Sequence, residues 1–173
     1  MLASARKIKC FGIAFGMAAI SDLVFTNGSA PMTATSAFTV QLRLTASCTI
    51  NINSASILDF GSQGVLSEAV DRSSTLDILC SRNAPYIIAL DQGTGPGATA
   101  DARELTNGSA AIIYSLYQDT AHSTVWGNTI GINTVAANGT GGSQSYVIYG
   151  EIPPQVTPAP GTYTDTVRVT VAY

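Results

Sequence analysis

Residues 37–52 read AFTVQLRLTASCTINI, and this stretch decides the fold class. Its first half carries an apolar side chain at every second position, at Phe38, Val40, Leu42 and Leu44. A period of two is typical of a β-strand with one buried and one solvent-facing side. The same parity continues to Ile52, well beyond the usual strand length of about five or six residues. We therefore expect a first half that pairs with a partner and a second half that opens this domain's own sheet.

The composition favours a single all-β domain. The chain has 173 residues, of which 46% are hydrophobic and only 11% are charged, and it contains 16 glycines. That length suits one domain, and frequent β-branched residues with many turn formers favour strands over a helical bundle. The hydrophobic fraction is high enough to bury a core, which excludes intrinsic disorder.

The N-terminus has the pattern of a secretory signal peptide. Basic residues within positions 6–9 precede the apolar run 10–25, and small residues follow it. Polar residues interrupt the run, so it is a poor candidate for a permanent membrane span. We expect cleavage between residues 30 and 37, and we favour Ser36 over Ala30 because Pro31 follows Ala30. Residues 1–36 are therefore assigned to the signal peptide.

Removal of residues 1–36 leaves an acidic chain without lysine. Five arginines and ten acidic residues remain, which gives a net charge of −5. A nucleic-acid partner requires a basic surface to neutralise phosphates, and the mature chain has none. A polybasic patch for an anionic membrane surface is excluded on the same grounds.

The two cysteines that remain after processing predict a disulfide. Cys48 and Cys80 form an even pair in an exported chain, and each lies on the apolar parity of an expected strand. The two residues form no CxxC motif, so we expect a structural bridge with no redox role.

Further alternating or apolar runs complete a sandwich. We expect turns at Asn107-Gly108 and Asn138-Gly139. The last expected strand places Val167, Val169, Val171 and Tyr173 on its buried face. Six or seven short strands with no helical stretch are typical of a β-sandwich. The other expected strands are residues 57–60, 75–80, 85–90, 110–118 and 145–152.

Nothing in the sequence indicates catalysis, a metal or a cofactor. His122 is the only histidine and lies in a polar segment, so we interpret it as a solvated loop residue. No GxSxG motif accompanies it, and the acidic residues are scattered singly. Several tyrosines and Trp126 could form a sugar-binding surface, but packing in the core or at an interface is the favoured interpretation.

The mature chain resembles the spore coat protein U domain, which is shared with subunits of archaic chaperone–usher pili. The resemblance covers about residues 38–173 and rests on the order and spacing of several short pieces. These pieces are Cys48, Phe60-Gly61, Cys80, Leu90-Asp91-Gln92-Gly93, residues 103–107 (RELTN), residues 114–119 (YSLYQD), residues 149–152 (YGEI) and residues 161–171 (GTYTDTVRVTV).

The resemblance implies an incomplete immunoglobulin-like β-sandwich that lacks its last strand. In that family a periplasmic chaperone fills the resulting groove, and the N-terminal strand of the next subunit replaces the chaperone strand after passage through an outer-membrane usher. For this chain it implies a donor strand at residues 37–46, with Phe38, Val40, Leu42 and Leu44 as donor side chains, and a sandwich at residues 47–173. Val167, Val169, Val171 and Tyr173 would then line the edge of the groove. Sister subunits would be partners in a head-to-tail polymer that passes through the periplasm to the cell surface.

Two alternatives remain open at this stage. A coat protein would use the same domain and the same strand exchange. A monomeric secreted binding module would keep residues 37–46 in its own sheet.

Overall fold

The structure is a computed structural model that describes residues 32–51 and 57–173. The chain divides into two units, Met1–Gln41 and Leu42–Tyr173, and all strands of the described residues lie in the second unit. The predicted signal peptide, residues 1–36, falls mostly outside the described residues. Within the described ranges no helix has the length and apolar character that a membrane span requires.

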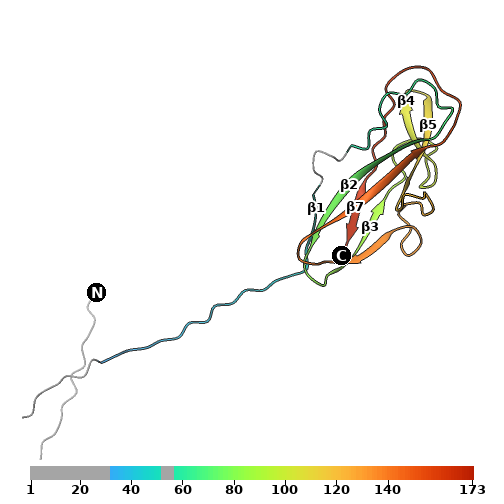
Figure 1. Cartoon of the computed structure of the whole chain (residues 1–173). Coiled ribbons are helices and arrows are strands. Elements are labelled where there is room, and N and C mark those ends of the chain that lie inside the picture. The colour runs from blue at the N-terminus through green and yellow to red at the C-terminus, as the bar shows by residue number, and fades with distance from the viewer. Residues whose placement is uncertain (1–31, 52–56) are drawn as a thin grey trace, which may run out of the picture. The chain divides into compact units, whose positions relative to one another are not determined.

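Eight strands in the described residues form two sheets (Figure 1). The five-stranded sheet has the order β1 (Cys48–Asn51), β2 (Val70–Cys80), β7 (Ser143–Ile152), β5 (Ala110–Tyr117) and β4 (Arg103–Asn107). The three-stranded sheet has the order β6 (Val135–Asn138), β3 (Pro85–Leu90) and β8 (Val169–Ala172). Every pair of neighbouring strands is antiparallel, as in an immunoglobulin-like sandwich.

The pairing of β2 with β7 is the longest in the first sheet. Its register runs from Val70 opposite Ile152 to Leu79 opposite Ser143. On β2, Leu76 and Ile78 face the core with 3% and 0% exposure, whereas the intervening side chains face outward. The polar first half of β2, VDRSST, lacks this buried face and belongs to the strand through its pairing with β7.

The core lies between the two sheets and is closed by aromatic side chains. Trp126 is 1% exposed, and its indole N–H donates a hydrogen bond to the carbonyl of Ile88 at 3.2 Å. The hydroxyl groups of Tyr86 on β3 and Tyr146 on β7 form a hydrogen bond of 2.6 Å between the sheets. A polar group of each ring is therefore satisfied where the ring is buried, as buried aromatic residues require.

The expected strands differ from the observed ones mainly in extent. The strand predicted at residues 85–90 is confirmed as β3, and the turn predicted at Asn107-Gly108 joins β4 to β5, with Gly108 at φ +61°. In the stretch 37–52, only Cys48–Asn51 is a strand among the described residues, and it opens the domain's own sheet as expected for the second half. The pairing of the first half with a partner stays a prediction. Residues 57–60 form no strand. Two observed strands were not expected from the sequence: β4, and β6 in the polar segment after Trp126.

The predicted disulfide between Cys48 and Cys80 is confirmed. The two residues are register partners on β1 and β2, so the bridge ties the short edge strand β1 to the sheet. Beside it, the Ser81 backbone N–H donates to the Ser47 carbonyl at 2.9 Å. The disulfide therefore fixes the point at which the folded sheet begins.

A buried arginine anchors the end of β3 to the start of β4. Arg103 is fully buried, and its guanidinium donates to the carbonyls of Asp91, Ala100 and Trp126 at 3.0, 2.7 and 2.7 Å. Burial disfavours the charged form and lowers the pKa of Arg103, while nearby acidic groups oppose that effect. Carbonyl acceptors thus take the place of a direct carboxylate partner for this cation.

The C-terminal segment before β8 is held by two aspartates. Asp91 Oδ1 accepts hydrogen bonds from the backbone N–H groups of Gly93 and Arg168 at 3.0 and 2.8 Å. Asp165 accepts from the Thr94 backbone N–H at 2.7 Å and from the Tyr114 hydroxyl at 2.7 Å. Gly93, at φ +84°, has no room for a Cβ because Asp165 lies against it.

Hydrogen bonds decide the direction in which the pKa of Asp165 is shifted. Partial burial alone would raise the pKa of this carboxyl group, but the bonds from Thr94, Tyr114 and the Thr166 backbone together lower the pKa below its ordinary value of 3.8. A carboxylate with a lowered pKa stabilises the fold above the pKa of the unfolded state, and this contribution is lost as the pH falls through the folded-state pKa.

Removal of the disulfide is expected to lower the stability substantially. The bridge spans a sequence separation of 32 residues, so the double variant Cys48→Ser/Cys80→Ser should lose about 3–4 kcal/mol of unfolding free energy in the chain-entropy model. Urea unfolding of the variant and of the oxidised parent measures the difference. A loss below about 1 kcal/mol would contradict the structural role assigned to the bridge.

Asp165→Asn is expected to lower the unfolding free energy at pH 7 by about 1–2 kcal/mol. A neutral amide replaces the charged carboxylate as hydrogen-bond acceptor, and partial exposure of the site keeps the loss modest. The part of the acid destabilisation that begins below pH 3.8 should shrink in this variant. Urea unfolding at neutral and acidic pH tests both effects, with the exposed carboxylate variant Glu68→Gln as the control. An equal acid response in Asp165→Asn and the parent would refute the assignment.

Candidate strand-acceptor groove

The second sheet ends at β8, a strand of four residues. On one side β8 pairs with β3, with Val169 opposite Leu90 and Val171 opposite Ile88. Within the described residues, no strand pairs with the other side of β8. A strand at the edge of a sheet presents free N–H and C=O groups that can receive another strand.

An apolar groove of about 290 Å³ opens beside this edge. Strands of both sheets contribute to it, together with the segments around residues 57–60 and 165–169. Leu76, Leu90 and Leu116 form part of its floor, and Asp165 with Tyr114 supplies polar groups. Phe60, Val167 and Val169 also line it. The groove is thus suited to apolar side chains that project from an extended backbone.

The residues expected at the groove edge divide into two groups. Val167, Val169 and Val171 are half-buried and pack against the core. Val167 and Val169 also line the groove. The expectation that Tyr173 lies on the buried face was wrong for the isolated chain, because its side chain is 62% exposed and lies beyond the end of β8.

The four expected donor side chains are strongly exposed. The exposed fractions are 87% for Phe38, 83% for Val40, 81% for Leu42 and 85% for Leu44. Residues 32–47 have no helix or strand. Burial of each such side chain contributes roughly 1.5–3 kcal/mol, so four alternating exposed side chains favour association with an apolar surface.

The aromatic residues considered for a sugar-binding surface are buried or half-buried. Tyr114 and Trp126 are 4% and 1% exposed, and Tyr146 donates or accepts the hydrogen bond with Tyr86 between the sheets. Tyr163 donates its hydroxyl hydrogen to the Ala159 carbonyl at 2.8 Å. The favoured interpretation of these rings as packing residues agrees with their positions.

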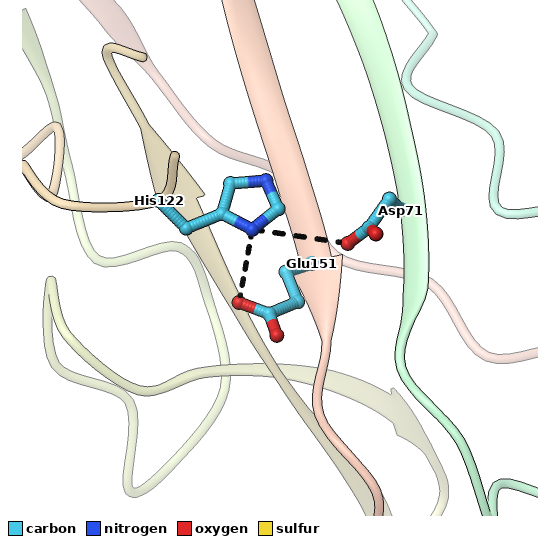
Figure 2. A group of neighbouring side chains, drawn as sticks. All are labelled: Asp71, His122 and Glu151. Carbon is cyan, nitrogen blue, oxygen red and sulfur yellow. Dashed lines mark ion pairs between the residues drawn. The ribbon is translucent and has the colours of Figure 1, made fainter. Parts of the chain in front are cut away.

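His122 has neighbours that the sequence analysis missed. Its Nδ1 atom lies 3.4 Å from Glu151 Oε2 and 3.9 Å from Asp71 Oδ1 (Figure 2). Asp71 on β2 and Glu151 on β7 are register partners, so the sheet itself brings the two carboxylates together. His122 lies in a loop, as expected. Its side chain is only 21% exposed and stacks on the Tyr117 ring with 4.7 Å between the ring centroids, so the expectation that it is solvated was wrong.

Comparisons with known proteins agree with this architecture. The model of the Spore Coat Protein U domain family matches residues 34–170. Protein U of Myxococcus xanthus is 30% identical over 107 residues, which cover 58% of this chain and 59% of that protein. The chain therefore spans less than two thirds of this curated relative.

Two solved structures share the fold at low identity. The first is the CsuC–CsuE chaperone–tip adhesion subunit pre-assembly complex from archaic chaperone–usher Csu pili of Acinetobacter baumannii. It matches with a TM-score of 0.52 and 23% identity over 75% of this chain and 40% of that chain. The second is a chaperone–usher pilus structure that addresses rod uncoiling, with a TM-score of 0.51 and 12% identity over 83% of this chain and 99% of that chain. The family model covers most of the residues that form the two sheets, and this chain therefore belongs to the Spore Coat Protein U domain family.

Proposed function

We propose that this chain is a structural, non-enzymatic subunit of a cell-surface pilus that assembles by donor-strand exchange. The observation that carries the proposal is the combination of an apolar groove beside the free edge of β8 with four exposed alternating side chains at residues 38–44. The exposed segment 38–44 can supply an extended strand, and the groove beside β8 has room for one. Strand addition would place this segment in a groove and pair it with the free edge of β8.

A second copy is the occupant that fits the groove in the assembled state. The donor segment of one subunit would enter the groove of the next, with Phe38, Val40, Leu42 and Leu44 as the buried side chains. Their burial would contribute on the order of 6–12 kcal/mol before the cost of ordering the segment. Donation from one subunit to the next is a head-to-tail contact that does not close, so it produces a fibre.

Assembly of this kind requires partners that keep the groove covered before polymerisation. A periplasmic chaperone, an outer-membrane usher and sister subunits are the proposed partners, in agreement with the chaperone complex and the pilus that share the fold. The chain would be exported through cleavage of residues 1–36, held in the periplasm and displayed on the cell surface.

A coat protein is the second candidate, because the matching family is described by spore coat protein U and its curated relative is Protein U. Both candidates use strand exchange in the same groove. They differ in the product, since a pilus is a thin fibre that projects from the cell envelope and a coat is a layer on the cell. Negative-stain electron microscopy of cells that express the chain with its chaperone and usher distinguishes the two.

The donor face is tested by a matched pair of charge substitutions. Val40→Asp places a carboxylate on the proposed buried face, whereas Gln41→Asp adds the same charge on the opposite face. Val40→Asp should reduce polymers at least 10-fold, because a buried unpaired charge costs several kcal/mol, and Gln41→Asp should leave them unchanged. The measurement is the heat-sensitive ladder on detergent gels of unheated periplasmic material.

Two results would contradict donor-strand exchange through this face. One is an undiminished ladder from Val40→Asp. The other is a parent chain that remains a monomer in the presence of the chaperone and usher, which would favour a self-contained binding module.

A further inference from the structure

The structure assigns a second site to this chain, a divalent metal site of the Zn²⁺ class formed by Asp71, His122 and Glu151. It lies at the ends of β2 and β7 and in the loop after β5, and none of its three residues lines the groove. The inference is independent of the proposed function, so either can fail without the other.

The donor set has the geometry of a metal site. One ligand atom from each residue lies within 4.8 Å of the other two. Two ligands bound to one Zn²⁺ at about 2.1 Å in a tetrahedral arrangement are roughly 3.4 Å apart. The 3.4 Å separation of His122 Nδ1 and Glu151 Oε2 matches this value, and the 3.9 Å to Asp71 Oδ1 requires only a small movement of a side chain that is 61% exposed.

The sheet holds two carboxylates next to each other, and a bound cation would relieve their repulsion. Asp71 and Glu151 stand directly opposite each other in the β2–β7 register, and like charges at such positions destabilise a sheet. His122 approaches both carboxylates from a different element (Figure 2). An imidazole nitrogen with two carboxylate oxygens is a donor set that suits zinc and related transition metals better than Ca²⁺ or Mg²⁺, which prefer oxygen ligands alone.

His122 is held in place before any metal arrives. Asp119 Oδ1 accepts from the backbone N–H groups of Ala121 and Ser123 at 3.0 and 3.1 Å, which closes the loop around His122. The Tyr117 ring stacks on the imidazole with an interplanar angle of 29°. The backbone of His122 has φ +54°, a conformation that asparagine also adopts readily. The loop thus presents Nδ1 toward the carboxylates at little further ordering cost.

The test is calorimetric titration of the full chain, purified from the periplasm, with Zn²⁺ and separately with Ca²⁺. We expect one Zn²⁺ per chain, with affinity at least 10-fold higher than for Ca²⁺ and weaker at acidic pH, since a protonated imidazole does not bind metal. His122→Asn preserves the backbone conformation, and it should lower the Zn²⁺ affinity at least 10-fold, as should Glu151→Gln. Asp77→Asn, on the same face of β2 but far from the histidine along the strand, is the matched control and should leave binding unchanged.

Several results would overturn the metal site. An absence of Zn²⁺ binding would leave His122 as an ion-pair partner of the two carboxylates. Equal binding by His122→Asn and the parent, or equal affinity for Zn²⁺ and Ca²⁺, would mean that Zn²⁺ binds only to scattered surface carboxylates. Loss of folding in His122→Asn, measured by thermal unfolding, is separated from loss of ligation by Glu151→Gln, which retains the loop.

Discussion

Each β-strand in a sheet has two sides that require hydrogen-bond partners, and β8 has a strand on one side only within the described residues. In the second sheet, β3 is therefore the central strand, and β8 is a strand at the edge. β3 is paired on both sides, by β6 and β8, and its side chains Ile88 and Leu90 are fully buried. Val169 and Val171 of β8, together with Val167 before it, are half-buried and complete that burial. The outer side of β8 pairs with no strand of the described residues.

The groove beside β8 is held in shape by polar contacts that need no partner. Asp91 and Asp165 fix the segment that leads into β8, and Arg103 fixes the end of β3 against which β8 pairs. Tyr114 joins the two parts by donating to Asp165 from the floor of the groove. A groove arranged in advance lowers the ordering cost of an incoming strand, so more of its apolar burial becomes binding free energy.

Much of the sandwich could be predicted from the sequence because its signal is local. The run 85–90 is continuously apolar and bounded by turns, and it is β3. The first half of β2, β4 and β6 were missed because most of their side chains are polar or small. Pairing with β7, β5 and β3, respectively, makes them strands. Residues 37–47 have a strand's alternation but no strand in the described chain. A period of two reports which side can be buried but not which chain buries it.

The Asp71, His122 and Glu151 cluster could not be predicted for a related reason. The three residues come from segments far apart in the sequence, and only the β2–β7 register shows that the two carboxylates stand opposite each other. The disulfide was predictable because two cysteines in an exported chain allow one pairing. Contacts that depend on register require the structure, whereas contacts fixed by elimination do not.

Hydrogen exchange at the backbone of β8 tests the central claim most directly. If the outer side of β8 receives a strand from another subunit, some amides of Val169–Ala172 that exchange quickly in the isolated chain should become protected at least 100-fold in the assembled polymer. The amides of β3, which is paired on both sides in either state, should change little. Equal exchange of the β8 amides in the isolated and the assembled chain would show that subunits join elsewhere and would contradict the account.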